Sequence, residues 1–443
     1  MSATSPDTIS LEKEVPHPPA RIRYDVEQKV GLAEALPLSL QHLFAMFGAT
    51  VLVPFLFKVN PATSLLMNGI GTLVYLVVAK GKIPAYLGSS FAFISPVFAV
   101  MAIPVLGGYS AAQGGFIVFG LFFILVSQII RVAGVDWVEV IFPPAAMGAI
   151  VAVIGLELAP VATDMAGLTG KTIEQQHIPY ATAIEVSMFT LGITVLGSIL
   201  LRGFLAAIPV LIGVIAGYSL SLFMGIVDLA AIKAAPWFEV PTLYAPTFKL
   251  SAILMIMPAM LVVLAEHIGH LVVTGNIVER DLIKEPGLHR SLLGDGISNV
   301  LSGFAGATPN TTYGENIGVM AITKVFSVWV IGGAAVIAVL VSFIGKLAAL
   351  IRSIPVPVMG GVCILLFGVI AAAGIRMLIE KKVDYTRSKN LVLTSVVLIG
   401  GLSGAAVKFG TIELKGMALG TAVALVVSLV FELFARLKLS NDP

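Results

Sequence analysis

The sequence predicts an all-α polytopic membrane protein with fourteen transmembrane segments in two inverted repeats of seven. Of its 443 residues, 58% are hydrophobic, and the mean hydropathy is +1.00. Charged residues make up 12% of the chain, about half the share of a soluble protein. The apolar residues gather in successive runs, many of them near the roughly 20 residues that a helix needs to cross a bilayer.

Fourteen apolar segments follow one another along the chain. Their approximate ranges are 37–57, 63–80, 86–103, 111–132, 141–160, 182–201, 203–225, 251–273, 291–306, 310–323, 325–345, 354–375, 390–406 and 416–436. Segment three contains Gly88-Ser89-Ser90 and Pro96, and segment ten opens with Pro309-Asn310-Thr311-Thr312. We predict that each of these two is an extended stretch followed by a half-helix. Such backbone survives at membrane depth only where protein or a cavity covers it.

The basic residues predict the orientation. With the N-terminus inside, 19 of the 27 Lys and Arg residues fall on the cytoplasmic side and 8 outside, as the positive-inside rule expects. Both termini are therefore expected in the cytoplasm. Residues 1–35 are polar and lack the apolar core of a signal peptide, so we expect a flexible cytoplasmic tail. We expect residues 438–443 to form a short C-terminal tail.

The two halves of the chain share a pattern. Gln41-His42 in segment one matches Glu266-His267 in segment eight at an offset of 225, and Gly88 matches Gly314 at 226. Met147-Gly148 matches Met359-Gly360 at 212. Seven spans per half require the halves to be inverted, and paired broken helices in inverted repeats indicate a secondary-transporter site.

Ionisable groups within segment eight are candidate site residues. Glu266 and His270 are four residues apart and share one helix face. A charge at bilayer depth costs about 2.5–3.5 kcal/mol and normally faces a cavity, a partner or a substrate. The pair is interpreted as a ligand-binding carboxylate with a proton-handling imidazole, and the alternative is a structural pair that braces two helices. His267 points elsewhere, which favours packing or hydrogen bonding.

The two breaks supply further candidates. Glu315-Asn316 lies where segment ten should restart as a helix, and a helix start offers unpaired N–H groups and a positive dipole end. Glu315 either binds a ligand there or caps its half-helix. Phe91 follows the break in segment three and would offer a ring face for stacking, or would pack as most membrane Phe residues do. Asp295 and Glu157 are further acids in apolar runs and are interpreted as structural.

Several other functions lose support. No Walker loop or Gly-x-Ser-x-Gly motif occurs, and no nucleophile–base pair or metal spacing is evident, so we expect neither an enzyme nor a metal site. His267-Ile268-Gly269-His270 spells an aminoacyl-tRNA synthetase signature without its nucleotide-binding context. Cys363 is the only cysteine, which excludes an intrachain disulfide. The sequence contains no basic stripe of the kind that binds nucleic acid, so we expect no nucleic-acid partner.

Three motifs resemble the nucleobase/ascorbate transporter family, also called nucleobase–cation symporter-2. Its signature [Q/E/P]-N-x-G-x-x-x-x-T-[R/K/G] is matched by residues 315–324, from Glu315 to Lys324. Its first-helix Gln-His is matched by Gln41-His42, and its A-E-H-x-G-H stretch by residues 265–270. The resemblance covers about residues 36–437.

The resemblance implies a division into core and gate. Residues 36–135 and 229–348 would form the core domain (segments one to four and eight to eleven). Residues 136–228 and 349–437 would form the gate domain (segments five to seven and twelve to fourteen). Short antiparallel strands would break segments three and ten, and the ligand would lie between the two domains. A homodimer through the gate domain is also implied.

The resemblance further implies a proton-coupled importer of uracil in the cytoplasmic (inner) membrane, with the proton as coupling ion and no other cofactor. Phe91, Glu266, Gly314 and Glu315 would bind the base. Glu266, His270 and Glu315 would take part in proton coupling. Gln41, His42 and Asn316 would support the site.

Two alternatives remain open. Glu315 stands where purine carriers often have Gln, which favours a pyrimidine, but xanthine or thymine is an alternative cargo. An anion exchanger of the same architecture is the less favoured reading, because two acids at the site disfavour anions.

Overall fold

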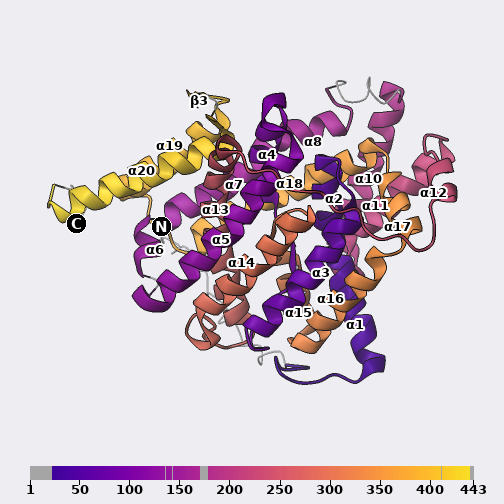
Figure 1. Cartoon of the computed structure of the whole chain (residues 1–443), viewed down its shortest axis with the longest axis horizontal. Coiled ribbons are helices and arrows are strands. Elements are labelled where there is room, and N and C mark those ends of the chain that lie inside the picture. The colour runs from indigo at the N-terminus through magenta and orange to yellow at the C-terminus, as the bar shows by residue number, and fades with distance from the viewer. Residues whose placement is uncertain (1–21, 135, 142, 170–177, 411, 440–443) are drawn as a thin grey trace, which may run out of the picture.

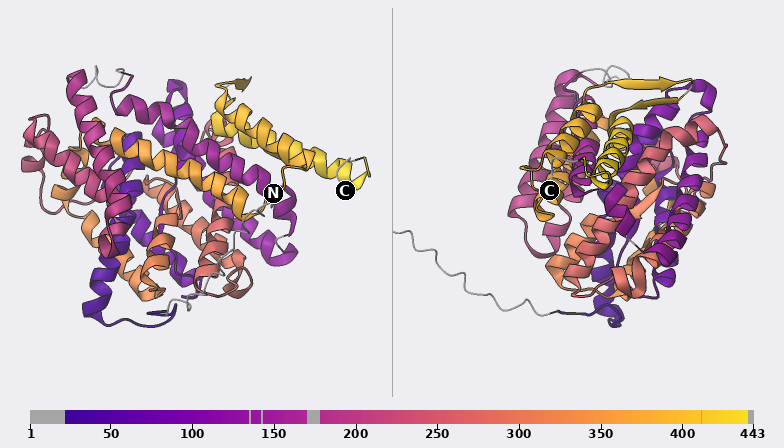
Figure 2. Two further views of the ribbon diagram at one scale, coloured as in Figure 1. Left: turned by 180° about the vertical axis from the view of Figure 1, so that it is seen from behind. Right: turned by 90° about the vertical axis from the view of Figure 1, so that its left-hand side faces the viewer.

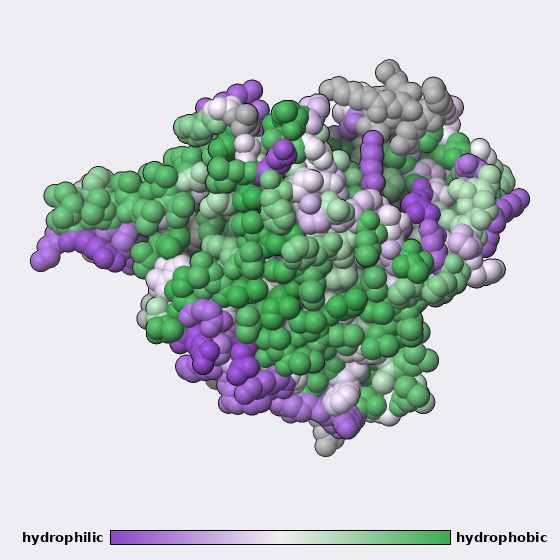
Figure 3. Space-filling model, in the orientation of Figure 1, coloured by the Kyte–Doolittle hydropathy of each residue, from purple (hydrophilic) through white to green (hydrophobic). Residues whose placement is uncertain are grey.

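In a computed structural model, residues 22–134, 136–141, 143–169, 178–410 and 412–439 are described. Long helices cross the body of the molecule side by side (Figure 1), and a second pair of views shows the same bundle from behind and from one end (Figure 2). Apolar residues cover the middle of the face seen in Figure 3, with hydrophilic residues along its lower edge. This surface suits a protein surrounded by lipid.

The first half of the chain runs from α1 to α12. The helices are α1 (Leu32–Ala45), α2 (Phe47–Phe57), α3 (Pro61–Val78), α4 (Ile94–Met101), α5 (Tyr109–Ala133), α6 (Asp136–Ile141), α7 (Pro144–Glu157), α8 (Ala159–Met165), α10 (Tyr180–Leu200), α11 (Pro209–Phe223) and α12 (Ala230–Ala234), with the 3₁₀ turns η1 (Phe91–Phe93), η2 (Pro104–Leu106) and η3 (Gly203–Ala207). Helix α3 shows why they start where they do. The Asn60 side chain accepts the Ala62 N–H at its N-cap, and Pro61 occupies its first turn.

The second half runs from α13 to α20. Its helices are α13 (Leu250–Ile277), α14 (Leu288–Ala305), α15 (Gly314–Thr323), α16 (Val328–Ser342), α17 (Gly345–Arg352), α18 (Val356–Glu380), α19 (Ser388–Leu402) and α20 (Gly416–Arg436), with the π turn η4 (Ile283–Gly287) before α14. Helix α16 begins at a Ser327 N-cap, whose hydroxyl accepts the Trp329 N–H.

The mostly helical membrane fold predicted from the sequence is confirmed. Each of the fourteen predicted segments overlaps a helix of the structure. Among the described residues, eight helical stretches are long and apolar enough to cross a membrane, and four more apolar helices have 10–17 residues. The number of fourteen crossings and the inverted repeat therefore stay predictions.

The predicted breaks in segments three and ten are confirmed as short antiparallel strands. Strand β1 (Leu87–Ser89) pairs with β2 (Asn310–Thr312), with Gly88 opposite Thr311. Each strand leads directly into a short helix, η1 and α4 after β1 and α15 after β2. Each stretch bonds part of the backbone of the other, and the Leu87 and Asn310 N–H groups donate to the side chains of Thr72 and Asn299, so buried backbone at membrane depth is paired.

The structure contains a surface hairpin that was not predicted from the sequence. Strands β3 (Ala406–Phe409) and β4 (Ile412–Lys415) pair antiparallel between α19 and α20, at the top of Figure 1. The apolar run was extended to residue 406, whereas α19 ends at Leu402. Lys408 and Glu413 lie opposite each other and form an ion pair at 3.3 Å. Such cross-strand pairing is invisible in a hydropathy pattern that follows only apolar runs.

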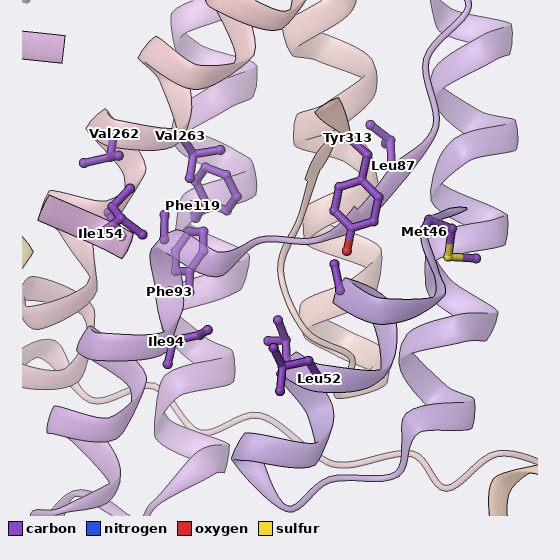
Figure 4. Close-up of a cluster of buried hydrophobic side chains, with 14 of the residues drawn as sticks. Met46, Leu52, Leu87, Phe93, Ile94, Phe119, Ile154, Val262, Val263 and Tyr313 are labelled. Carbon is purple, nitrogen blue, oxygen red and sulfur yellow. The ribbon is translucent and has the colours of Figure 1, made fainter. Parts of the chain in front are cut away.

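Helices pack through small residues and aromatic clusters. In the predicted core domain, α14 contacts α3 and α5, and α3 contacts α16. A Cβ at Gly120 of α5 would lie 2.6 Å from the Gly296 carbonyl oxygen of α14, so the two backbones touch, as is common between membrane helices. Around the break in segment three, the rings of Phe93 and Phe119 lie 4.9 Å apart in a buried cluster (Figure 4). This packing fixes the start of α4.

Residues 22–31 lie against the segment between α15 and α16. The Phe326 N–H donates to the Tyr24 carbonyl at 2.8 Å, and the Val328 N–H donates to the Val26 carbonyl at 2.9 Å. Val26 is fully buried. The predicted flexible tail, residues 1–35, thus includes a docked stretch and the first turn of α1, while residues 1–21 lie outside the described residues.

Candidate functional site

The two broken segments bring two helix starts to one small ladder. The three residue pairs of β1 and β2 are flanked by two further bonds, from Ser90 N–H to the Pro309 carbonyl at 2.8 Å and from Tyr313 N–H to the Tyr86 carbonyl at 3.1 Å. Directly beyond the ladder, η1 starts at Phe91 and α15 starts at Gly314. The first N–H groups of a helix have no partner within it and carry its positive dipole end.

Helix α13 lies against this ladder. The His270 Nδ1 atom lies 3.0 Å from the Thr312 hydroxyl of β2. A Cβ built on Gly314 would lie 3.5 Å from His270 Nε2, so the imidazole faces the start of α15. Contacts of α13 with η1, β2 and α15 complete the arrangement. The helix face carrying Glu266 and His270 therefore meets the break in segment ten, although the two are separated in the sequence.

Two carboxyl groups lie near each other on the contacting helices α13 and α15. Glu266 is half-buried, whereas Gly314 and Glu315 are exposed on α15. One turn further, a Cβ at Gly318 would find no atom within 4 Å, so α15 is uncovered along this face. Glu266 and Glu315 lie close enough to repel each other electrostatically. The site thus combines carboxylate acceptors with the N–H donors of a helix start.

Phe91 is placed at the second helix start. Its ring is half-buried and forms a T-shaped contact with Phe367 on α18, with centroids 6.3 Å apart and planes at 84°. The geometry leaves part of the ring uncovered. Phe91 therefore both packs and presents a partly open surface, so the two readings from the sequence are not exclusive.

The predicted supporting residues lie behind α15. The Asn316 amide nitrogen lies 3.0 Å from His42 Nδ1 and donates to the His42 carbonyl at 3.2 Å. Both side chains are buried, as is that of Gln41 beside them on α1. Asn316 and His42 fasten α15 to α1. Their role in transport stays a prediction.

His267 and Asp295 form a buried network under the site. His267 Nδ1 lies 2.9 Å from Asp295 Oδ2, and its Nε2 lies 2.7 Å from the Ser291 hydroxyl. The Ser291 hydroxyl also lies 2.6 Å from the Tyr75 hydroxyl. All four side chains are fully buried. The geometry matches the hydrogen-bonding interpretation of His267 and the structural interpretation of Asp295.

This network also reaches the ladder. The Asn299 amide donates to Asp295 Oδ1 at 2.9 Å, and its Oδ1 accepts the Asn310 N–H of β2 at 2.6 Å. A buried charge is stable only when paired and hydrogen-bonded. No sequence signal singled out Tyr75, Ser291 or Thr312, because ordinary hydroxyl residues acquire these roles only through their neighbours in space.

A separate cavity of about 580 Å³ lies where the connection between α2 and α3 meets α17 and α18. Its walls include Val59 and Asn60 between α2 and α3, and Arg352 and Val356 at α17 and α18. None of the predicted site residues lines it. Within the described part of the chain, no group of three or more His, Cys, Asp or Glu side chains is arranged to hold a metal ion.

Comparison with known proteins gives a consistent result. Residues 33–409 match the model of the Permease family. Uracil permease of Escherichia coli (strain K12) is 62% identical over 413 residues, which are 93% of this chain and 95% of that protein. Uracil permease of Paenibacillus larvae is 58% identical over 94% of this chain and 98% of that protein. Uracil permease of Bacillus subtilis (strain 168) is 48% identical over 88% of this chain and 91% of that protein.

Solved structures show the fold. The transmembrane domain of the cyanobacterial bicarbonate transporter BicA covers 91% of this chain and 100% of that chain, with a TM-score of 0.63 and 16% identity. SLC26A9 covers 91% of this chain and 66% of that chain, with a TM-score of 0.68 and 11% identity. At these identities the likeness concerns architecture alone. From the family match and the close relatives, the chain belongs to the nucleobase/ascorbate transporter family of permeases.

Proposed function

We propose that the protein carries uracil across the membrane. The observation that supports this most strongly is the convergence of Glu266 and Glu315 with the helix start at Gly314. Uracil is a flat ring with two N–H donors and two carbonyl acceptors. Two carboxylates match the donors, and backbone N–H groups match the acceptors. The uracil permeases that are 62% and 58% identical support the same cargo.

Each site residue has a distinct role in this proposal. Glu266 and Glu315 accept the ring N–H groups, in bonds to charged partners that contribute about 1.5–3 kcal/mol each. The backbone at Gly314 donates to a ring carbonyl, and Phe91 covers one ring face. A base that left one of these groups unpaired would be rejected, because an unpaired buried polar group is costly.

Proton coupling completes the transport step. His270 faces the start of α15, which carries Glu315, and Glu266 lies on the same face of α13, so a proton held by this cluster changes the charge that the ligand meets. Interacting groups titrate together, and the proton belongs to the cluster rather than to one residue. The proton enters with uracil from outside and leaves with it inside, so the proton gradient drives import.

Movement of a core domain against a gate domain would expose the site to each side in turn. Residues 36–135 and 229–348 form the proposed core, and residues 136–228 and 349–437 the proposed gate. The contact of Phe91 with Phe367 supports a ligand position between them, because Phe91 belongs to the core and Phe367 to the gate. Alternating access of this kind is the general mechanism of transporters built from paired broken helices.

The protein is placed, in the same proposal, in a bacterial inner membrane with both termini cytoplasmic, as a homodimer through the gate. Large apolar residues on the gate helices, such as Ile379 and Ile399, are 72% and 70% exposed in the single chain. Lipid or a second gate domain would cover them. Cross-linking of single cysteines at these positions in membranes tests the dimer.

The experiment that tests the function is uptake of labelled uracil in cells that lack their own uracil carrier, with and without a protonophore. Uptake that collapses with the proton gradient is the expected result. No uptake, in cells where the protein is present in the membrane, would contradict the proposal. Competition by unlabelled xanthine and thymine separates the alternative bases. Competition by bicarbonate or chloride tests the anion exchanger, which only the shared fold favours.

A further inference from the structure

Glu157, the last residue of α7, joins three helices. Its Oε1 accepts the Ser95 hydroxyl of α4 at 2.5 Å, and its Oε2 accepts the Met417 N–H of α20 at 2.7 Å. A Cβ at Gly416 would lie 1.7 Å from Glu157 Oε1, so the start of α20 closes directly over the carboxyl group. The side chain is half-buried.

The Ser95–Glu157 bond crosses the boundary between the proposed domains. Ser95 belongs to the core and lies one helical turn after Phe91, on the half-helix that starts at the site. Glu157 belongs to the gate. By contrast, the Thr394 hydroxyl of α19 donates to the Ala145 carbonyl of α7 at 3.3 Å, a bond between two helices of the gate. A bond across the boundary must break when the core moves against the gate.

We infer that Glu157 is a positioning residue for transport. In the conformation of Figure 1 it holds α4, and with it Phe91, in a fixed position against the gate. The inference rests on the proposed function, because it requires core and gate to move. It assigns no ligand contact to Glu157. The carboxyl group acts through Ser95 on the helix that carries the ring.

A purely structural role of Glu157 would depend on a different bond. A carboxylate at the start of α20 is favourable by itself, because the first N–H groups and the dipole end of a helix attract negative charge. That role needs Met417 and Glu157, which are both in the gate, but it does not need Ser95. The variant Ser95→Ala removes only the bond across the boundary and leaves the bond to α20 in place.

The experiment uses the full-length protein with a reporter cysteine in the separate cavity. Cys363 is fully buried and is replaced by alanine, and Val356, which lines the cavity from the gate side, is replaced by cysteine. A membrane-impermeant maleimide is applied to cells, and the labelling rate is measured with and without uracil. Uptake of labelled uracil gives KM and the maximal rate for the same variants.

We expect Ser95→Ala to slow labelling of the reporter by about two- to fivefold, because loss of a bond to a charged group shifts the conformational equilibrium about tenfold. The maximal uptake rate should change more than KM. Glu157→Gln should act in the same direction, and Ser95→Thr, which keeps the hydroxyl, should restore the parent values. Ser198→Ala removes a hydroxyl bonded only within α10 and serves as the matched control.

The inference would be overturned if Ser95→Ala had the same labelling rate and the same uptake kinetics as the reporter protein without this substitution. An effect of Glu157→Gln that Ser95→Ala does not share would also overturn the inference, because the bond to α20 would then explain it. If Ser95→Ala were lost from the membrane, Ser95→Cys would test the same bond. Failure of the wild type to take up uracil would contradict the proposed cargo, whereas the labelling shift would still report on Glu157.

Discussion

Gly88 is the position where one added carbon should disturb the site most. A Cβ at Gly88 would lie 2.3 Å from two ring carbons of Tyr313 and 2.7 Å from its hydroxyl. Real Cβ atoms do not approach so closely, so the ring must move. Tyr313 is only 4% exposed, and its hydroxyl donates to the Ser89 carbonyl at 2.9 Å. The ring lies next to Leu87 of β1 in a buried cluster (Figure 4).

The cost of Gly88→Ala follows from these contacts. Overpacking a filled interior costs about 1–3 kcal/mol. Losing the Tyr313–Ser89 hydrogen bond adds about 0.5–1.5 kcal/mol. Because Tyr313 immediately precedes α15, its displacement also moves Gly314 and Glu315. We therefore expect both a lower melting temperature and a strongly raised KM for uracil.

The assay combines thermal unfolding of the purified protein in detergent with uptake of labelled uracil. Gly332→Ala on α16 is the matched control, since its nearest new contact is an ordinary 3.6 Å from Leu76. Gly314→Ala should keep the melting temperature, because its Cβ meets only His270 Nε2 at 3.5 Å, but it should impair uptake by filling the site. Parent melting temperature and parent KM in Gly88→Ala would refute the reasoning.

Three further predictions concern charged groups. Glu315→Gln should raise the KM for uracil by about 10- to 150-fold, the loss of one bond to a charged acceptor, and unchanged uptake kinetics would rule out its contact with the ligand. Glu266→Gln should abolish accumulation against a gradient, and normal accumulation would contradict its role in coupling. Arg280 bonds Glu27 at 2.6 Å and holds the pKa of that carboxyl below its usual value. The pair therefore stabilises the docked segment fully at a pH above the usual glutamate pKa. This contribution is lost as the pH falls through the lowered pKa of Glu27. Arg280→Gln should expose residues 22–31 to protease at neutral pH, unlike Lys284→Gln, whose ion pair is with Asp281; equal cleavage would contradict this.

Much of the site was predictable because its residues violate the membrane pattern. Acids are rare at bilayer depth, so Glu266 and Glu315 stood out against apolar neighbours. Pro and Gly at the two breaks predicted the extended stretches and the helix starts, since these residues interrupt helices, whereas the antiparallel strands were implied by the family resemblance. The offsets between halves matched the two breaks as equivalent positions of the repeat, and the structure pairs the strands at these breaks with each other.

The remaining features depend on contacts that no linear pattern contains. Thr312 bonds His270, and Ser95 bonds Glu157, only because segments far apart in the chain meet. The β3–β4 hairpin was missed for a related reason, since short amphipathic strands leave a weak signal beside long apolar runs. Glu157 was interpreted as structural, and its sequence context could not reveal its contact with the half-helix α4, which belongs to the other proposed domain.

The pairing of β1 with β2 has a consequence for biogenesis. Leu87 and Thr312 are partners, so a ribosome must add more than two hundred residues after the first strand before its partner exists. During that interval the stretch at residues 87–89 lacks its partner strand, and the backbone groups that would bond that strand are left unpaired, which is costly in lipid. The nascent N-terminal half therefore needs water, a chaperone or the insertion machinery at this stretch. Chains truncated before residue 310 should be degraded faster than chains truncated after residue 323, and equal lifetimes would argue against this order of assembly.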